Sequence, residues 1–292
     1  MKSVKDTYTL NNGVKIPCFG FGTYKAKYGD STEIIDRAIS AGYRFFDTAS
    51  IYETERPLGK AVKNSGIPRE EFTIASKLWI DEMGYENAKK AFNASLERLQ
   101  TDYLDLYLIH WPRPNTEDPD WKELDLETWR ALEELYAQGK IRALGCSNFL
   151  PHHLDNLLKN AKVKPTVDQL EIHPGYSQEA AVAYCLSNDI RPMAWAPLGR
   201  FRDHPVVSDC LQGMAEKYGK SVAQICLRFE LEKGIIPIPK ASSLEHMKSN
   251  MDIFDFSLSP EDVSILSCMP QTAWIGAHPD FVPPKKQSNP DQ

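Results

Sequence analysis

Short apolar runs alternate along the chain with longer stretches in which apolar residues recur every three or four positions. The short runs predict buried strands at 19–21, 44–46, 73–75, 106–109, 142–144, 167–170, 192–194 and 235–238. The longer stretches at 31–43, 85–100, 126–140 and 221–234 have the spacing of amphipathic helices. In the third of these, Trp129, Leu132 and Leu135 share one face, and Gly139 then ends the run.

Strands that alternate with helices of this length predict an α/β fold with a parallel sheet. Because eight such units follow one another without a break in the alternation of strand and helix, we expect a closed (β/α)8 TIM barrel rather than an open sheet. Apolar runs flank Asn11-Asn12-Gly13, which predicts an N-terminal β-hairpin at one end of the barrel. No linker or repeat divides residues 1–292, so we expect a single domain, with a polar, Pro-rich and mobile tail at about 283–292.

The composition argues against several classes of function. The net charge is −6 and no block of Lys and Arg occurs, which disfavours a nucleic-acid partner and an anionic membrane partner. The amino terminus has no apolar signal-peptide core, and no run of about 18 apolar residues is present to span a bilayer. The 6 cysteines are scattered without a C-x-x-C pair, so we expect reduced thiols in a cytoplasmic protein.

Polar side chains occur at the carboxyl ends of the predicted strands, where barrels of this kind carry their active sites. Asp47 closes the second strand, with Tyr52 beyond it, Lys77 closes the third and His110 the fourth. Each has an ordinary structural explanation when taken alone, such as a helix cap or packing. Together they would place an acid, a phenol, an amine and an imidazole at the same end of the barrel, where unpaired buried charges are costly.

These four groups fit proton donation to a carbonyl oxygen. A free tyrosine has a pKa of about 10, and a neighbouring ammonium lowers it. Lys77 would supply that ammonium, Asp47 would keep it charged and oriented, and His110 would hold the substrate oxygen against Tyr52. General acid catalysis of this kind is worth about 10² to 10⁴ in rate. It also requires a source of electrons, which no side chain here provides.

The motifs around these residues resemble those of the aldo-keto reductases over nearly the whole chain. The resemblance lies in GYRFFDTASIY, TIASKLW, TDYLDLYLIHWP, GKIRALGCSNF, VDQLEIHP, WAPLGR and IIPIPKASSLEHMKSNMDIFDFSLSPED. It implies a barrel that reduces an aldehyde or ketone to an alcohol by hydride transfer from NADPH or NADH. From the residues themselves we expect no catalytic metal ion. The catalytic tetrad would be Asp47, Tyr52, Lys77 and His110. It further implies a small carbonyl compound as partner, and a monomer.

The resemblance also assigns the cofactor contacts. Ser147, Asn148 and Gln169 would bind the nicotinamide carboxamide, and Trp195 would stack on the nicotinamide ring. Gly22, Thr23 and the residues from Leu198 to Arg200 would lie along the ribose and pyrophosphate. Lys240, Ser242, Ser243 and His246 would form the 2′-phosphate site, Asn250 would contact the adenine, and Asp47 would also contact the cofactor. Trp195 stands where the family usually has tyrosine, and its larger face should still stack on the ring. His246 stands where NADPH-preferring members carry arginine, a permanent and bidentate cation, whereas imidazole is mostly neutral at pH 7. We therefore expect NADPH with a weakened preference, and appreciable use of NADH.

Aromatic residues near the tetrad are expected to form the substrate cleft. These are Tyr24, Trp79, Trp111 and Trp274, together with His110, and Trp274 would belong to a C-terminal substrate loop. The polar and Pro-rich residues 113–123 are expected to form a mobile loop over the mouth.

Other functions remain open at this point. A Schiff-base aldolase could use Lys77 as its nucleophile, although Tyr52 would then have no role. A cofactor-binding sensor or structural protein of the same fold would keep the site with little turnover, and the direction of reaction could be alcohol oxidation. A barrel hydrolase with Glu171 and His173 as metal ligands would need a His-x-His on the first strand, which residues 18–24 lack.

Overall fold

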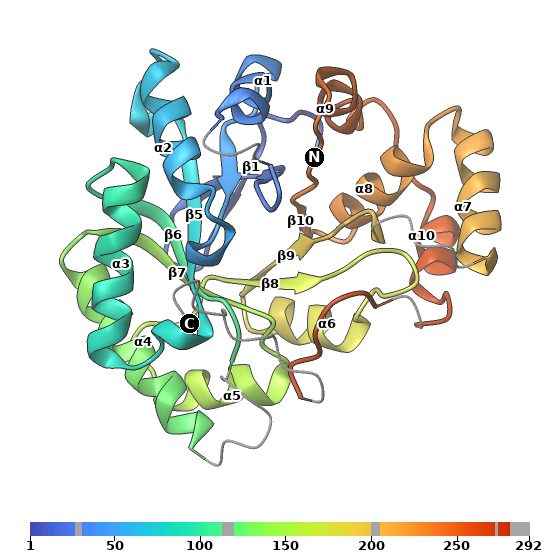
Figure 1. The fold of residues 1–292 in the computed structure, drawn as a ribbon. Helices are drawn as coiled ribbons and strands as arrows, with labels where there is room; N and C mark the ends of the chain where they lie inside the picture. The colour runs from blue at the N-terminus through green and yellow to red at the C-terminus, as the bar shows by residue number, and fades with distance from the viewer. Residues whose placement is uncertain (27–30, 113–119, 200–204, 272–273, 281–292) are drawn as a thin grey trace, which may run out of the picture.

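The computed structural model describes residues 1–26, 31–112, 120–199, 205–271 and 274–280 of the chain. At its centre lie eight parallel strands, ordered from β10 down to β3, and each strand pairs with its neighbour in the sequence (Figure 1). The strands are β3 (Phe21–Gly22), β4 (Phe45–Asp47), β5 (Thr73–Leu78), β6 (Leu104–Ile109), β7 (Ile141–Ser147), β8 (Val167–Glu171), β9 (Arg191–Trp195) and β10 (Ile236–Pro237). The predicted α/β fold is confirmed.

Backbone hydrogen bonds join the two outer strands of this sheet and close it into a barrel. The Gly20 N–H donates to Pro237 O at 3.0 Å, and the Gly22 N–H donates to Pro239 O at 3.1 Å. A β-carbon at Gly22 would lie 3.0 Å from Ile238 O, so glycine permits this close approach of the two backbones. The first predicted strand, 19–21, is in fact displaced to Phe21–Gly22, because this is where the chain pairs with β4.

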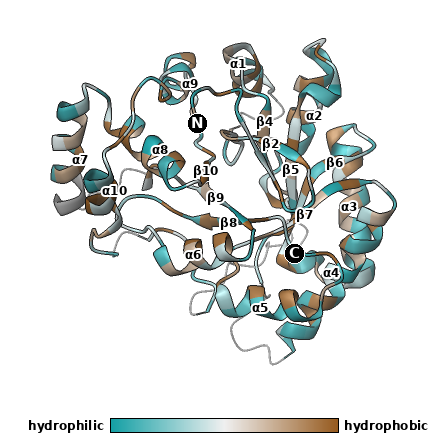
Figure 2. Cartoon of the chain, turned by 180° about the vertical axis from the view of Figure 1, so that it is seen from behind, coloured by the Kyte–Doolittle hydropathy of each residue, from teal (hydrophilic) through white to brown (hydrophobic). Residues whose placement is uncertain are grey.

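Helices surround the sheet (Figure 1). They are α1 (Glu33–Ala41), α2 (Glu55–Asn64), α3 (Tyr85–Leu99), α4 (Trp121–Ala137), α5 (Pro151–Asn160), α6 (Glu179–Ser187), α7 (Pro205–Tyr218), α8 (Val222–Glu232), α9 (Leu244–Met251) and α10 (Pro260–Ser267), with 3₁₀ turns η1 (Ser50–Tyr52), η2 (Arg69–Glu71) and η3 (Ile80–Glu82). The hydropathy colours of Figure 2 show hydrophilic and hydrophobic residues on the same helices, as amphipathic helices require.

The strands separate two apolar cores because successive side chains point to opposite faces. Phe45 of β4 belongs to the cluster inside the barrel, whereas Phe46 belongs to the large cluster beneath the helices. The predicted hairpin is confirmed: β1 (Thr7–Thr9) pairs antiparallel with β2 (Lys15–Pro17). Its Ile16 joins the interior cluster, and the Asn12 amide donates to Arg142 O at 3.0 Å. The hairpin therefore covers the amino-terminal end of the barrel and leaves the other end for function.

Two predictions about loops have different outcomes. Of the segment 113–123, residues 113–119 lie outside the described residues, and the loop prediction is wrong for 121–123 because α4 begins at Trp121. The predicted tail at 283–292 also lies outside the described part of the chain, as does Arg200. None of the described helices is long and apolar enough to cross a membrane.

Candidate active site

A cavity of about 760 Å³ lies at the carboxyl ends of the strands. The residues proposed from the sequence that line it are Gly22, Tyr24, Asp47, Tyr52, Trp79, His110, Trp111, Asn148, Gln169, Trp195, Leu198 and Lys240. The sequence did not point to several further lining residues, among them Lys25, Ile51, Ile238, Gly276 and Ala277. Apart from Lys25 these five residues are apolar, and apolar residues give no chemical signal in a sequence.

A buried ion pair lies beneath this cavity. Lys77, near the end of β5, is fully buried, and its Nζ donates to Asp47 Oδ1 at 2.6 Å and to Thr48 O at 2.9 Å. Burial lowers the pKa of Lys77, and the charge of Asp47 opposes this change. The second carboxylate oxygen of Asp47 accepts from Gln169 Nε2 at 2.7 Å. The pair is therefore almost completely buried, and hydrogen bonds hold it in one orientation.

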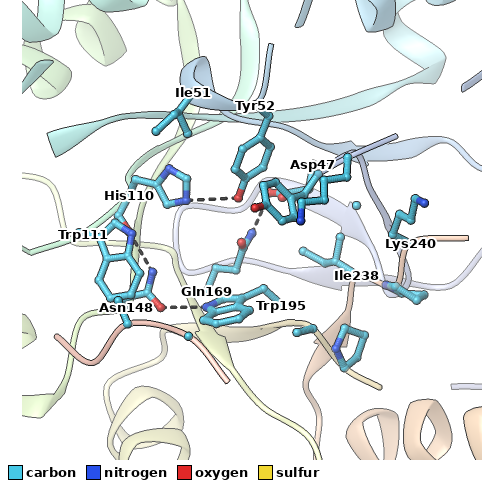
Figure 3. Close-up of a pocket in the computed structure, with 18 of the residues that line it drawn as sticks. Asp47, Ile51, Tyr52, His110, Trp111, Asn148, Gln169, Trp195, Ile238 and Lys240 are labelled. Carbon is cyan, nitrogen blue, oxygen red and sulfur yellow. Dashed lines mark hydrogen bonds between the residues drawn. The ribbon is translucent and has the colours of Figure 1, made fainter. Parts of the chain in front are cut away.

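Tyr52 and His110 meet beside Asp47 of this pair (Figure 3). Tyr52 ends η1, the 3₁₀ turn that follows β4, and its Oη lies 3.2 Å from His110 Nε2. Lys77 Nζ lies 5.1 Å from the centre of the Tyr52 ring. Burial, and then the charge of Lys77, hold the pKa of His110 well below its usual value, so its imidazole is neutral at pH 7. The structure thus brings the four tetrad side chains together.

A carboxylate that the sequence did not single out holds the turn that carries Tyr52. Glu82 Oε2 accepts from Ser50 Oγ at 2.6 Å and from the backbone N–H of Trp79 at 2.7 Å. Because Ser50 begins η1 and Trp79 follows β5, this carboxylate ties the Tyr52 turn to the next strand. The only sequence signal was an acid three residues after Trp79, which is the spacing of a capping box.

Amide side chains form the wall opposite Tyr52. Asn148 Nδ2 donates to His110 O at 3.0 Å, and Asn148 Oδ1 accepts from Trp195 Nε1 at 2.8 Å (Figure 3). Two hydroxyls assigned to the cofactor lie elsewhere. Ser147 Oγ donates to Gln169 O at 2.8 Å and Thr23 Oγ1 donates to Asp47 O at 2.9 Å, and neither residue lines the cavity. Both hydroxyls brace the ends of strands.

The far end of the cavity carries a cation. Lys240 follows β10, and its Nζ donates to Ser242 Oγ at 2.6 Å. Partial burial lowers the pKa of Lys240. Ser243 Oγ caps α9 by accepting from the His246 N–H at 3.1 Å, the His246 side chain is exposed, and Asn250 is buried in the same helix. An aromatic face, two amides and a distant cation in one cavity fit an extended dinucleotide.

The chain shows high similarity to proteins of known family. A model of the Aldo/keto reductase family matches residues 18–268. The glyoxal reductase of Bacillus subtilis (strain 168) is 47% identical over 281 residues, which cover 95% of this chain and 98% of that protein. The 9,11-endoperoxide prostaglandin H2 reductase of Trypanosoma cruzi (strain CL Brener) is 39% identical, covering 93% and 94%. The chain belongs to the aldo/keto reductase family.

Solved structures of this family share the fold of the reductase. An aldo/keto reductase from Brucella melitensis aligns with a TM-score of 0.82 at 41% identity, covering 90% of this chain and 98% of that one. A Bombyx mori aldo-keto reductase, solved in complex with NADP, aligns with a TM-score of 0.80 at 34% identity, covering 91% and 92%. The protein is therefore an NAD(P)H-dependent oxidoreductase with a (β/α)8 barrel.

The side of the cavity nearest His110 is aromatic in this reductase. Trp79 and Trp111 are buried in a small apolar cluster with Ile80, and the Trp79 ring lies edge-on to His110 with centroids 4.9 Å apart. Tyr24 lines the cavity at its exposed rim. Trp274 is 41% exposed and does not line the cavity, so the structure does not bring it to the predicted cleft.

One group of possible metal ligands lies outside the cavity. The ligand atoms of His152, His153 and Asp280 lie within 4.8 Å of one another. However, His153 Nδ1 accepts from the Leu150 N–H at 3.1 Å, so a neutral His153 ring carries its proton on Nε2, the atom that would bind the metal. The cluster is better explained as an attachment of Asp280 to α5, since His152 Nε2 lies 3.0 Å from Asp280 Oδ1.

Proposed function

We propose that this reductase converts an aldehyde or ketone into an alcohol, with Tyr52 as the proton donor. The observation that carries the proposal is the contact between Tyr52 Oη and His110 Nε2, 3.2 Å apart, beside the buried pair of Lys77 and Asp47. A carbonyl oxygen between the phenol and the imidazole would receive hydrogen bonds from both.

Each tetrad residue has a separate task in this proposal. The Lys77 ammonium stabilises the phenolate that remains after Tyr52 has given up its proton, because an opposite charge nearby favours the ionised form. Asp47 keeps Lys77 charged in a site where burial disfavours the ammonium. His110 is neutral, so its Nε2–H can orient the substrate oxygen without competing with Tyr52 as an acid.

NADPH or NADH, when bound, supplies the hydride. Trp195, Asn148 and Gln169 would hold the nicotinamide, and Lys240 the phosphate at the far end of the cavity. The exposed His246 supports a weakened NADPH preference, with NADH also used. The similarity to a glyoxal reductase supports small reactive aldehydes and dicarbonyls as substrates.

Tyr52→Phe tests this function directly. The purified reductase is mixed with glyoxal and with NADPH or NADH, and the loss of reduced-nicotinamide absorbance is followed. We expect turnover to fall by a factor of about 10² to 10⁴ in Tyr52→Phe. Tyr136→Phe is the matched control, since Tyr136 lies on α4 outside the cavity. Equal rates in the two variants would refute Tyr52 as the acid.

Cofactor binding and borohydride trapping separate the remaining alternatives. Binding of a cofactor without turnover by the unmodified protein would favour a sensor or structural role. Covalent trapping of substrate by borohydride would favour the Schiff-base aldolase, although Lys77 is buried and already donates to Asp47 and Thr48. We also infer a single-domain, monomeric protein, and light scattering on the purified chain tests the monomer. Its free cysteines support a cytoplasmic location.

A further inference from the structure

Glu171 makes a set of contacts that the proposed mechanism does not use. It is the last residue of β8, it is buried, and its carboxylate faces the C-terminal segment 274–280. Oε1 accepts from the Ile275 N–H at 2.7 Å and Oε2 from the Gly276 N–H at 3.1 Å. His173 Nε2 lies 3.1 Å from Oε1 and supports the same carboxylate. One carboxylate therefore holds two successive peptide groups.

The segment held in this way packs directly on Trp195. A β-carbon at Gly276 would lie 2.6 Å from Trp195 Cη2 and 3.1 Å from Glu171 Oε2. Glycine thus lets the backbone touch the indole edge and the carboxylate at the same time. Trp195 in turn donates to Asn148, so the segment backs the wall assigned to the nicotinamide.

Ala277, the next residue, continues the packing of this segment towards the aromatic part of the cavity, where we expect the substrate to bind. Ala277 lines the cavity and packs against the cluster of Trp79, Ile80 and Trp111. Three residues further along, Asp280 contacts His152 on α5. The segment therefore crosses the aromatic side of the cavity between two attachments, one at β8 and one at α5.

We propose that Glu171 is a positioning residue that holds Gly276 and Ala277 as a wall of the cavity and so determines which carbonyl substrates fit. This proposal rests on the carbonyl reduction proposed above. With the wall in place, a short aldehyde is enclosed by Ala277 and the two tryptophans. When the wall is released, the short aldehyde loses this enclosure, whereas a bulky aldehyde gains room.

Glu171→Gln removes the charge and places an NH₂ against one of the two peptide N–H groups while keeping the shape of the side chain. The first measurement is hydrogen exchange, by mass spectrometry, of a peptide covering 274–280 in the absence of cofactor and substrate. We expect these amides to exchange about tenfold faster or more, since hydrogen bonds to a charged acceptor are lost. Unchanged exchange would overturn the proposal, whatever the protein catalyses.

The second measurement compares kcat/KM for glyoxal and for a bulky aromatic aldehyde. We expect an approximately tenfold loss for glyoxal, mainly in KM, and a smaller loss or a gain for the bulky aldehyde. Equal losses for both would show that Glu171 does not determine specificity. If the unmodified protein reduces neither compound, the proposed function has failed, and the exchange experiment still decides whether Glu171 holds the segment.

A second variant keeps the test valid if Glu171→Gln destabilises the barrel. Gly276→Ala places its β-carbon against Trp195 and Glu171, and we expect the same shift between the two aldehydes. Gly213→Ala is the matched control, because a β-carbon at this exposed position on α7 meets nothing within 4 Å. Identical substrate preference in the two alanine variants would also overturn the proposal.

Discussion

Replacing Asp47 with asparagine should lower both the stability and the turnover of this reductase, and the loss of stability should shrink as the pH rises. Asp47→Asn leaves Lys77 fully buried, with its hydrogen bond to Thr48 O still in place. Removing one member of a buried ion pair costs about 3–5 kcal/mol. Loss of the tuned acid should also reduce kcat by a factor of about 10² to 10⁴.

The pH dependence follows from the pKa of Lys77. Burial already lowers this pKa in the folded protein, and without the Asp47 charge it falls further. Between the folded and unfolded pKa values the unfolded state binds more protons, so the stability rises with pH across that window. Asp47→Asn moves the lower limit of this pH window to a lower pH, because that limit is the folded-state pKa of Lys77. The stability difference from the unmodified protein therefore decreases as the pH rises through the interval between the two folded-state pKa values of Lys77. Above that interval it stays constant, because both proteins then gain stability equally up to the unfolded pKa of about 10.4.

Urea unfolding of both proteins at about pH 6 and about pH 9.5 measures this difference. The control is Asp105→Asn, which removes another buried carboxylate, one that pairs with Arg69 and Arg142 at 2.9 and 3.1 Å. Guanidinium groups stay charged over this range, so the control should lose the same stability at both pH values. If Asp47→Asn also loses the same free energy of unfolding at both pH values, the reasoning is refuted.

Three further substitutions test other parts of the structure. His246→Arg should tighten NADPH binding about tenfold and leave NADH unchanged, as calorimetry would show; a parallel change for both would contradict a 2′-phosphate role. Trp195→Phe keeps a ring but removes the donor to Asn148, and should weaken cofactor binding about tenfold; an unchanged Kd would mean that the hydrogen bond is dispensable. Gly59→Ala should destabilise by about 1–3 kcal/mol, because its β-carbon would lie 2.3 Å from Leu99 O, and urea unfolding would detect this.

The tetrad could be predicted from the sequence because parallel strands end at a common edge. β4, β5 and β6 are neighbours in the sheet, so polar residues at their ends must converge. Asp47, Lys77 and His110 were visible because they interrupt apolar runs. The structure places them together, although their catalytic roles stay predictions.

Other contacts had no signal in the sequence. Glu171 binds backbone N–H groups of residues about a hundred positions away, and a peptide N–H has the same chemistry at every residue. The hydroxyls of Ser147 and Thr23 turn to backbone carbonyls because strand ends leave acceptors there, and composition cannot show this direction. The start of α4 at Trp121 was missed because the preceding residues are polar and Pro-rich, which suggested a continuous loop.

The closure of the barrel between β3 and β10 affects the order in which the strands can pair while the chain is synthesised. Strands β4 to β10 each lie beside the strand synthesised just before, so they can pair in order as they leave the ribosome. The bonds from Gly20 and Gly22 must wait for Pro237 and Pro239, which are synthesised after β3 to β9. Until then β3 and β9 are open edges, which are templates for pairing between chains. Lys240 follows directly, so the phosphate end of the cavity is completed in the same late step that removes the open edges.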